Sequence, residues 1–142
     1  MIKKMFFVAS LLCFSNLLFA QDITHGTWWN QEKTSKVQFF KQGDKLFGKV
    51  VWLKEPNENG KPRVDKLNPD DKLKSRPLMG LVFFKNFKQE NAKKWEDGEI
   101  YDPKSGKTYD CYITIISPTV IEARGYIGIS LIGKTTKFTK AD

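Results

Sequence analysis

The segment that comes closest to a known chemical motif is residues 128–135, whose letters GISLIGKT match the phosphate-loop expression G-x-x-x-x-G-K-[ST]. A phosphate loop needs a parallel strand before it and a helix after it, because the helix N-terminus must face the phosphate. The residues after Thr135 contain Thr, Phe and Lys in an order typical of a strand. We therefore predict that this segment binds no nucleotide.

Metal and nucleophile chemistry is limited by the scarcity of suitable side chains. The chain has one histidine, His25, and two cysteines, Cys13 and Cys111. These numbers exclude a multi-histidine or cysteine-rich metal site and any mechanism that needs two histidines. Strand alternation puts Cys111 on the same side as Tyr109 and Ile113, which favours a small buried hydrophobe over a nucleophile. We expect no metal, no cofactor and no enzymatic reaction.

The acidic residues offer the remaining route to acid–base chemistry, which requires a carboxylate pair. They are interspersed with Lys and Arg in polar segments, so a solvated face is the stronger interpretation. The two groups that we considered are Asp65, Asp70 and Asp71, and Glu96, Asp97, Glu99 and Asp102.

Aromatic and arginine side chains on or beside the expected strands are the candidates for ligand contacts. They are Trp28, Trp52, Arg76, Tyr101, Tyr109, Arg124 and Tyr126.

Arg124 is the most informative of these candidates. Alternation places Arg124 and Tyr126 on one side of their strand and the apolar Ile121 and Ala123 on the other. If the apolar side faces inward, Arg124 is exposed or paired within the structure, which is the interpretation that we favour. If Arg124 faces inward, its guanidinium needs an acid or an anionic ligand group.

Length and composition indicate one globular domain. The chain has 142 residues, of which 40% are hydrophobic and 28% charged, which suffices for a core but not for a multidomain enzyme. The net charge of +8 permits weak attraction to anionic partners. The lysines are scattered, many of them beside acids, so we expect no nucleic-acid binding.

Residues 1–20 have the pattern of a secretory signal peptide. Lys3 and Lys4 precede a largely apolar run that ends at the small residue Ala20, and the run is too short and too interrupted for a stable membrane span. We expect cleavage after Ala20 and a periplasmic or secreted domain over residues 21–142. No membrane span would remain, and Cys111 would be the single thiol, without an internal disulfide partner.

The remaining sequence predicts an all-β domain. Short runs rich in β-branched and aromatic residues are separated by Gly, Pro, Asn and Asp. Hairpin turns are expected at residues 42–44 and 102–106. The eight predicted strands are residues 27–30, 36–41, 46–53, 78–84, 99–102, 108–116, 120–127 and 134–139.

Two connections are unusually long. Residues 55–76 are polar and too long for a hairpin turn, so we expect a functional loop. Residues 68–71 would cap one short helix in it, with Pro69 at the first helical position. Residues 85–96 form a lysine-rich connection that is expected to pack Phe87 and Trp95 against the body.

About eight antiparallel strands must hide their edges, either in a closed barrel or between two sheets. The segment Gly26, Thr27, Trp28 resembles the Gly-x-Trp of lipocalin-like barrels. That resemblance implies that Trp28 closes one end of a barrel beneath a basic residue of the last strand, here Lys137 or Lys134.

Four segments together resemble the bacterial exported family catalogued as domain of unknown function 2147. They are residues 26–28, 48–53, 102–109 and 124–130, and residues 68–70 and 76–81 also agree with its pattern. The resemblance implies a small lipocalin-like β-barrel outside the cytoplasm, with no established activity. Residues 137–140 read Lys-Phe-Thr-Lys, where the family more usually has Trp and Arg.

Two functions remain open on the sequence. In the leading one, the barrel binds a small apolar or amphipathic ligand between aromatic walls. In the alternative, the barrel interior is filled and the protein is an interaction module that meets another protein of the cell envelope. The volume inside the barrel distinguishes them.

Overall fold

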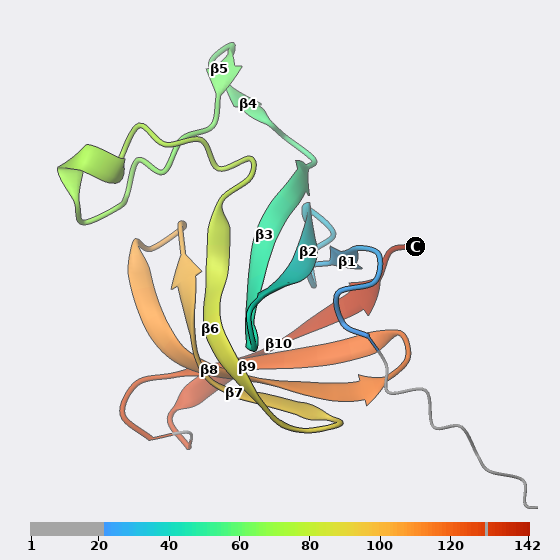
Figure 1. The fold of residues 1–142 in the computed structure, drawn as a ribbon. Coiled ribbons are helices and arrows are strands. Elements are labelled where there is room, and N and C mark those ends of the chain that lie inside the picture. Colours follow the sequence, from blue (N-terminus) through green and yellow to red (C-terminus); the bar gives the residue numbers. More distant parts are fainter. Residues whose placement is uncertain (1–21, 130) are drawn as a thin grey trace, which may run out of the picture.

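The computed structural model describes residues 22–129 and 131–142, so the predicted signal peptide lies outside the described residues. Within them, eight antiparallel strands close into a barrel, and the helical structure is one 3-10 turn (Figure 1). The predicted all-β, lipocalin-like barrel is thereby confirmed. The barrel strands are β1 (Trp28–Trp29), β2 (Ser35–Gln42), β3 (Lys45–Leu53), β6 (Val82–Asn91), β7 (Lys94–Asp102), β8 (Lys107–Ser117), β9 (Val120–Tyr126) and β10 (Gly133–Lys140).

The strands follow one another around the barrel in the order β1-β10-β9-β8-β7-β6-β3-β2, and β2 pairs with β1 to close it. Because neighbours are antiparallel, successive connections lie at alternate ends. One end carries residues 30–34, 54–81, 103–106 and 127–132, and we call it the open end. The other carries residues 43–44, 92–93 and 118–119 with both ends of the described chain, and we call it the closed end.

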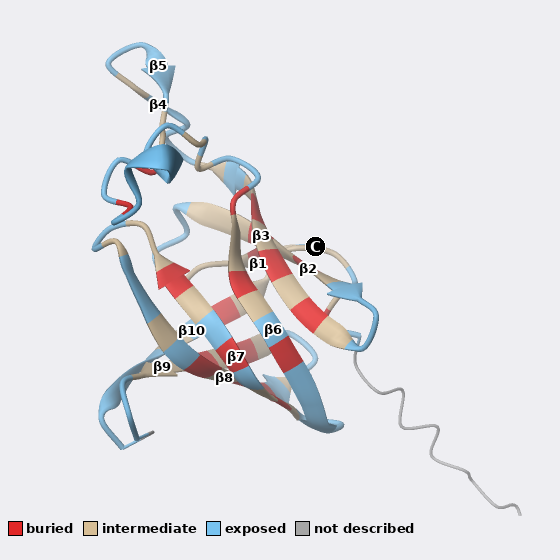
Figure 2. Ribbon diagram, turned by 60° about the vertical axis from the view of Figure 1, so that its left-hand side comes forward, coloured by how far each residue is buried: buried red, intermediate tan, exposed pale blue. Residues whose placement is uncertain are grey.

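Alternation of buried and exposed residues explains why these segments form barrel strands. In β8, Cys111, Ile113 and Ile115 are buried, and in β9 so are Ile121 and Ala123. One side of each strand therefore faces the interior, as period-two patterning requires. Figure 2 shows the buried residues along the barrel strands and few in residues 54–81.

The predicted hairpin turns are present, but one predicted connection is wrong. Gly43 and Gly106 adopt φ of 63° and 71° in the turns after β2 and β7. Residues 85–96, expected to be a connection, are mostly the paired ends of β6 and β7. Phe87 and Trp95 are buried as predicted, but from strands. The lysines of residues 85–96 suggested a connection, but a barrel strand also exposes every second residue to water.

The closed end is packed with aromatic side chains. Phe84 lies between Phe39 and Phe138, with ring centroids 5.1 and 5.6 Å away. Two buried glycines make room for the rings: a Cβ on Gly48 would lie 2.9 Å from Phe84, and one on Gly98 would lie 2.4 Å from Phe87. This half of the barrel is therefore filled by side chains.

Trp28 seals the closed end. Its side chain is fully buried, and its indole Nε1 donates to the Ile23 carbonyl at 3.0 Å. The Nζ atom of Lys140 lies 4.6 Å from the ring centroid. The expected basic partner is thus Lys140 and not Lys137 or Lys134, because β1 and β10 place Trp28 opposite Lys140. Sequence alone does not give this register.

Residues 54–81 rise above the open end of the barrel (Figure 1). They contain a small hairpin of β4 (Asn57–Glu58) and β5 (Lys61–Pro62), followed by the 3-10 helix η1 (Asp71–Leu73). The predicted helix is therefore shorter and later than expected: Asp70 caps it by accepting from the Lys72 amide at 3.0 Å, and Pro69 lies outside it.

Candidate ligand-binding cavity

The open half of the barrel encloses a cavity of about 1020 Å³. Apolar side chains line its inner part, and charged and polar residues border it where residues 30–34, 54–67 and 102–104 approach. The inner apolar lining consists of Val50, Leu81, Phe83, Ile100, Ala123 and Phe138. The interior is therefore filled in one half and hollow in the other, unlike the wholly filled barrel of the alternative function.

Gly125 explains part of the difference between the two halves. It lies on the inner side of β9, where a Cβ would meet Ile100 at 3.4 Å and Tyr109 at 3.6 Å, both ordinary contacts. At Gly48 and Gly98 an aromatic ring occupies the space that the absent side chain leaves, whereas the space at Gly125 belongs to the cavity. The ring of Tyr109 stays 3.9 Å from the position of a Cβ on Gly125, so this glycine helps to keep the open half hollow.

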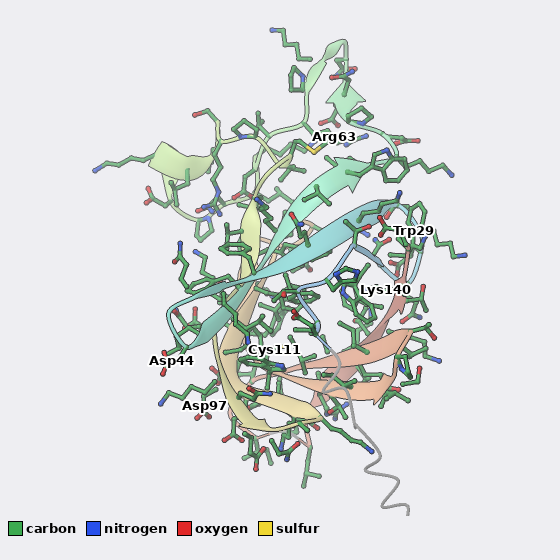
Figure 3. The ribbon with its side chains drawn as sticks, turned by 45° about the vertical axis from the view of Figure 1, so that its right-hand side comes forward. Trp29, Asp44, Arg63, Asp97, Cys111 and Lys140 are labelled. Carbon is green, nitrogen blue, oxygen red and sulfur yellow. The ribbon has the colours of Figure 1, made fainter. Side chains whose placement is uncertain are left out.

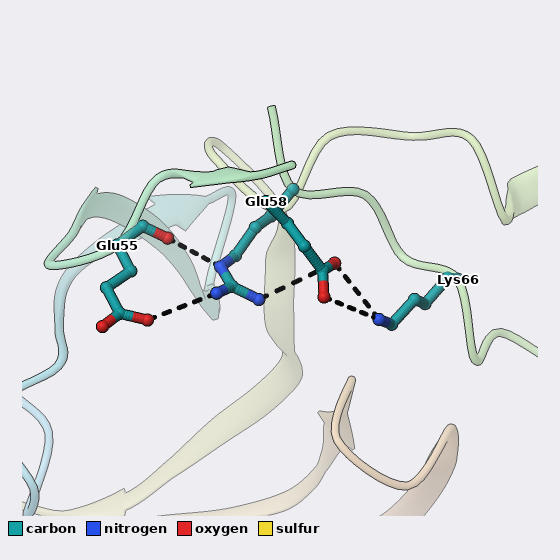
Figure 4. A network of polar contacts seen from close by, with 4 residues as sticks. Glu55, Glu58 and Lys66 are labelled. Atoms are coloured by element: carbon teal, nitrogen blue, oxygen red, sulfur yellow. Dashed lines mark hydrogen bonds and ion pairs between the residues drawn. The ribbon is translucent and has the colours of Figure 1, made fainter. Parts of the chain in front are cut away.

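A network of four charged residues braces the segment beside the cavity (Figure 4). Arg63 donates from Nε to the Glu55 carbonyl at 2.7 Å, and its guanidinium pairs with the carboxylates of Glu55 and Glu58 at 3.3 and 3.8 Å. Lys66 Nζ lies 3.0 Å from Glu58. The hydrogen bond and charge of Lys66 lower the pKa of the Glu58 carboxyl. Figure 3 shows Arg63 above the barrel that contains Cys111.

Three lysines bordering the cavity, Lys54, Lys104 and Lys134, form no ion pair among the described residues. Of the acids in the lining, Glu55 and Glu58 are paired with Arg63 and Lys66, whereas Glu32 and Asp102 form no ion pair among the described residues. The rim of the cavity therefore has cations available to an anionic group and two carboxylates beside them.

Asp65 fastens residues 54–81 to the barrel. It is 1% exposed and accepts three side-chain hydrogen bonds, from Tyr101 Oη at 2.6 Å, Arg76 Nε at 2.8 Å and Asn68 Nδ2 at 2.9 Å. Burial raises the pKa of the Asp65 carboxyl, but the hydrogen bonds from Tyr101, Asn68 and Arg76 outweigh burial and hold that pKa below its ordinary value. Burial and the bond to Asp65 raise the pKa of Tyr101 to about 12.

This network is structural in its geometry. Both Asp65 oxygens accept hydrogen bonds from protein side chains, and the carboxyl is ionised at neutral pH, so it has no proton to give. Asp65 was predicted to be a solvated acid, and that prediction is wrong. No local signal could have revealed the network, because Tyr101 is 36 residues away in the chain.

The structure brings three of the seven predicted ligand contacts to the cavity. Tyr101, Tyr109 and Tyr126 line it. Tyr109 is on the inner side of β8, whereas the ring of Tyr126 lies beside Tyr112 on the outer side, with centroids 6.2 Å apart. Tyr101 also borders a smaller hollow of about 190 Å³ beneath η1.

The other four predicted contacts do not line this cavity. Trp28 is in the closed end, and Trp52 is 38% exposed, edge-on to Trp29 at 5.4 Å. Arg76 pairs with Asp65 and borders only the small hollow. Arg124 lies on the outer side of β9, where it donates to Thr135 Oγ1 at 3.0 Å. The favoured outward placement of Arg124 agrees with the structure.

Cys111 takes the predicted place on the inner side of β8 and is fully buried. Burial raises the pKa of its thiol to about 12, so the reactive thiolate is scarce at neutral pH. In residues 22–129 and 131–142, no three His, Cys, Asp or Glu side chains are grouped to hold a metal ion. None of the helical structure in that same part of the chain has the length and apolar character to cross a membrane.

A closed eight-stranded antiparallel barrel with one sealed end and one hollow end is a lipocalin-like architecture. A solved structure supports that class: HP1028 from the human pathogen Helicobacter pylori, a protein that belongs to the lipocalin family, is similar with a TM-score of 0.74 and 25% sequence identity. The similarity covers 85% of this chain and 84% of HP1028.

The chain belongs to the family described as "Uncharacterized protein conserved in bacteria (DUF2147)", whose model matches residues 26–140. The match includes all eight barrel strands and confirms the family predicted from the sequence. No curated protein matches this chain significantly.

Proposed function

We propose that this protein binds one small amphipathic molecule in the open half of its barrel. The observation that carries the proposal is the cavity of about 1020 Å³, which lies at the upper end of the range for ligand sites, roughly 300–1,000 Å³. Its apolar inner lining suits a hydrocarbon or ring system. The lysines at its rim suit an anionic or polar head.

The packed closed end supports a binding role over a purely structural one. The aromatic residues around Phe84, sealed by Trp28, supply the core. The open half can therefore stay hollow, since the fold does not depend on filling it.

We also propose that residues 1–20 direct export, so that the barrel acts in the periplasm or outside the cell. The apolar run that ends at Ala20 supports this proposal. N-terminal sequencing of the protein from an envelope fraction tests it, with Gln21 expected as the first residue.

A cavity-filling variant tests ligand binding. The probe is dansylundecanoic acid, an amphipathic fluorophore with an acyl chain, titrated into the wild-type protein and into Gly125→Leu. Position 125 has room for the Cβ of a leucine, and because Gly125 lines the cavity, the rest of the leucine side chain should extend into it. Displacing about two methylene groups of the probe from the apolar lining would cost about 1.6 kcal/mol, which is roughly a tenfold weaker Kd.

The matched control is Glu122→Leu, which places the same side chain on the outer side of the same strand. We expect saturable binding at one site, a weaker Kd for Gly125→Leu and an unchanged Kd for Glu122→Leu. Absence of saturable binding to the wild type, together with a bare mass in native mass spectrometry of protein from the envelope, would contradict the proposal. So would equal binding by Gly125→Leu and the wild type.

A further inference from the structure

The loop between β9 and β10 exposes an unusual amount of aliphatic surface. The exposed fractions are 67% for Ile127, 56% for Ile129, 85% for Leu131 and 67% for Ile132. Soluble proteins seldom expose contiguous large aliphatic side chains unless the patch meets a partner or a membrane. Residues 127–132 include no charged residue.

The exposure does not result from a lack of structure in the loop. The Ile129 amide donates to the Ile127 carbonyl at 3.0 Å, and the Ile132 amide donates to the Ile129 carbonyl at 3.1 Å. Arg124 Nη2 donates to the Leu131 carbonyl at 3.4 Å from the neighbouring strand. These hydrogen bonds hold residues 127–129 and 131–132, whose apolar side chains are exposed.

The loop also lies at the mouth of the cavity. Ile127, Ile132 and Lys134 border the cavity, whereas Ile129 and Leu131 do not. Ile129 and Leu131, which do not border the cavity, are thus available to contact a binding partner or a membrane.

Charge is distributed unequally between the two ends of the barrel. The connections at the open end contain nine Lys or Arg and six Asp or Glu. The connections and described chain ends at the closed end contain one Lys or Arg and three Asp or Glu. The aliphatic loop therefore lies at the end of the barrel whose connections carry a net positive charge.

We propose that the side chains of Ile127, Ile129, Leu131 and Ile132 insert into an anionic phospholipid surface, with the lysine-bearing connections of the open end drawn to the lipid phosphates. Aliphatic insertion and attraction of nearby cations act together in interfacial binding. A second copy of the chain fits less well, because two positive open ends would face each other.

In this orientation the cavity mouth opens toward the lipid, so that a ligand could pass between the two without crossing water. This consequence rests on the proposed function, whereas the surface binding itself needs no occupied cavity.

Co-sedimentation with vesicles tests the proposal on the protein from residue 21 onward. One set of vesicles is phosphatidylcholine alone, and the other contains about one third phosphatidylglycerol. We expect partition onto the anionic vesicles at least about tenfold stronger than onto the neutral ones, weakened at ~0.5 M salt by charge screening. The combined variant Ile129→Ser with Leu131→Ser is expected to lose about tenfold or more of this partition.

The control variant is Ile116→Ser, which removes an aliphatic side chain that is 53% exposed near the closed end. It should bind anionic vesicles like the wild type. Failure of the wild type to bind the anionic vesicles, or equal binding by the combined variant, would overturn the proposal. So would light scattering that shows a dimer dispersed by the combined variant, because the patch would then be a self-association surface.

Dansylundecanoic acid binding without vesicles separates this proposal from the proposed function. The combined variant leaves the residues lining the cavity in place, so its affinity for the probe should equal that of the wild type. Vesicle binding can thus fail while probe binding persists. Probe binding can equally fail while vesicle binding persists, so the two proposals are tested separately.

Discussion

Replacing Asp65 with asparagine should release residues 54–81 from the barrel while leaving the barrel folded. In the wild type, Arg76 and Asn68 both donate to Oδ2 of Asp65, at 2.8 and 2.9 Å. An asparagine can turn its oxygen toward these two donors and donate from its amide to the Tyr101 hydroxyl. All three hydrogen bonds then remain, but they lose the negative charge that strengthens them.

The size of the effect follows from the charge that the substitution removes from three hydrogen bonds. A hydrogen bond to a charged group contributes about 1.5–3 kcal/mol and a neutral one about 0.5–1.5 kcal/mol, so each bond loses about 1 kcal/mol. The side chain of Arg76 is 28% exposed, so water recovers part of its solvation. For the three bonds together we expect local opening to become easier by up to about 3 kcal/mol, which is roughly a hundredfold in population.

Hydrogen exchange measured residue by residue by NMR is the suitable assay. The Asp65 amide donates to the Arg76 carbonyl and the Leu78 amide donates to the Arg63 carbonyl, both at 3.0 Å. Their protection factors should fall by up to about two orders of magnitude, or to the level of unprotected amides, in Asp65→Asn. Amides of β8 should keep their protection.

The matched control is Asp71→Asn, which makes the same chemical change at an acid whose side chain is 89% exposed and pairs only with Lys74. Protection of the Asp65 and Leu78 amides should change little there, as expected for a surface ion pair. A change of less than about threefold in Asp65→Asn would refute the reasoning, because it would fall far below the effect of removing the charge from these hydrogen bonds.

Two further predictions concern acid and packing. Because the pKa of Asp65 is lower in the folded protein than in the unfolded chain, its carboxylate stabilises residues 54–81 fully above about pH 4 and progressively less as the pH falls through the folded pKa. Hydrogen exchange corrected for intrinsic rates should therefore show constant protection of the Asp65 amide from neutral pH to about pH 5 and a selective loss of protection, relative to β8, in stronger acid. Retention of that protection in strong acid would contradict the role assigned to the Asp65 carboxylate. In urea unfolding, Gly98→Ala should destabilise the protein by about 1–3 kcal/mol, because the new Cβ overlaps the buried ring of Phe87. Gly125→Ala should be neutral or stabilising by up to about 1 kcal/mol. Equal stabilities of the two variants would show that Gly98 is not tightly packed.

The barrel strands could be predicted because each alternates apolar and polar residues between turn signals. Each of the eight predicted runs overlaps a barrel strand, although residues 78–81 of the run predicted at 78–84 lie in the connection before β6. The Gly-x-Trp at Trp28 correctly marked the closed end. The paired ends of β6 and β7 were missed, because their exposed lysines resemble a connection. Phe87 and Trp95 carried the correct signal there, since both are buried on the inner side.

The candidate site could be predicted only in part. Tyr109 and Tyr126 lie at the cavity because their strands end at the open end. A glycine inside a strand often marks a space that another group occupies, so Gly125 could have been noticed from sequence. Asp65 could not, since its role depends on how residues 54–81 fold back onto β7.

The meeting of the two chain ends at the closed end has a practical consequence for the barrel. Trp28 pairs with Lys140, more than a hundred residues away in the chain, and Thr27 donates to the Asp142 carboxylate at 2.9 Å from its backbone amide. Circular permutation that joins these ends and opens the turn at residues 43–44 would make this long-range pairing a local hairpin and move the long-range step to β2 and β3. An immobilisation tag attached at residue 142 would likewise leave the cavity mouth facing away from its support.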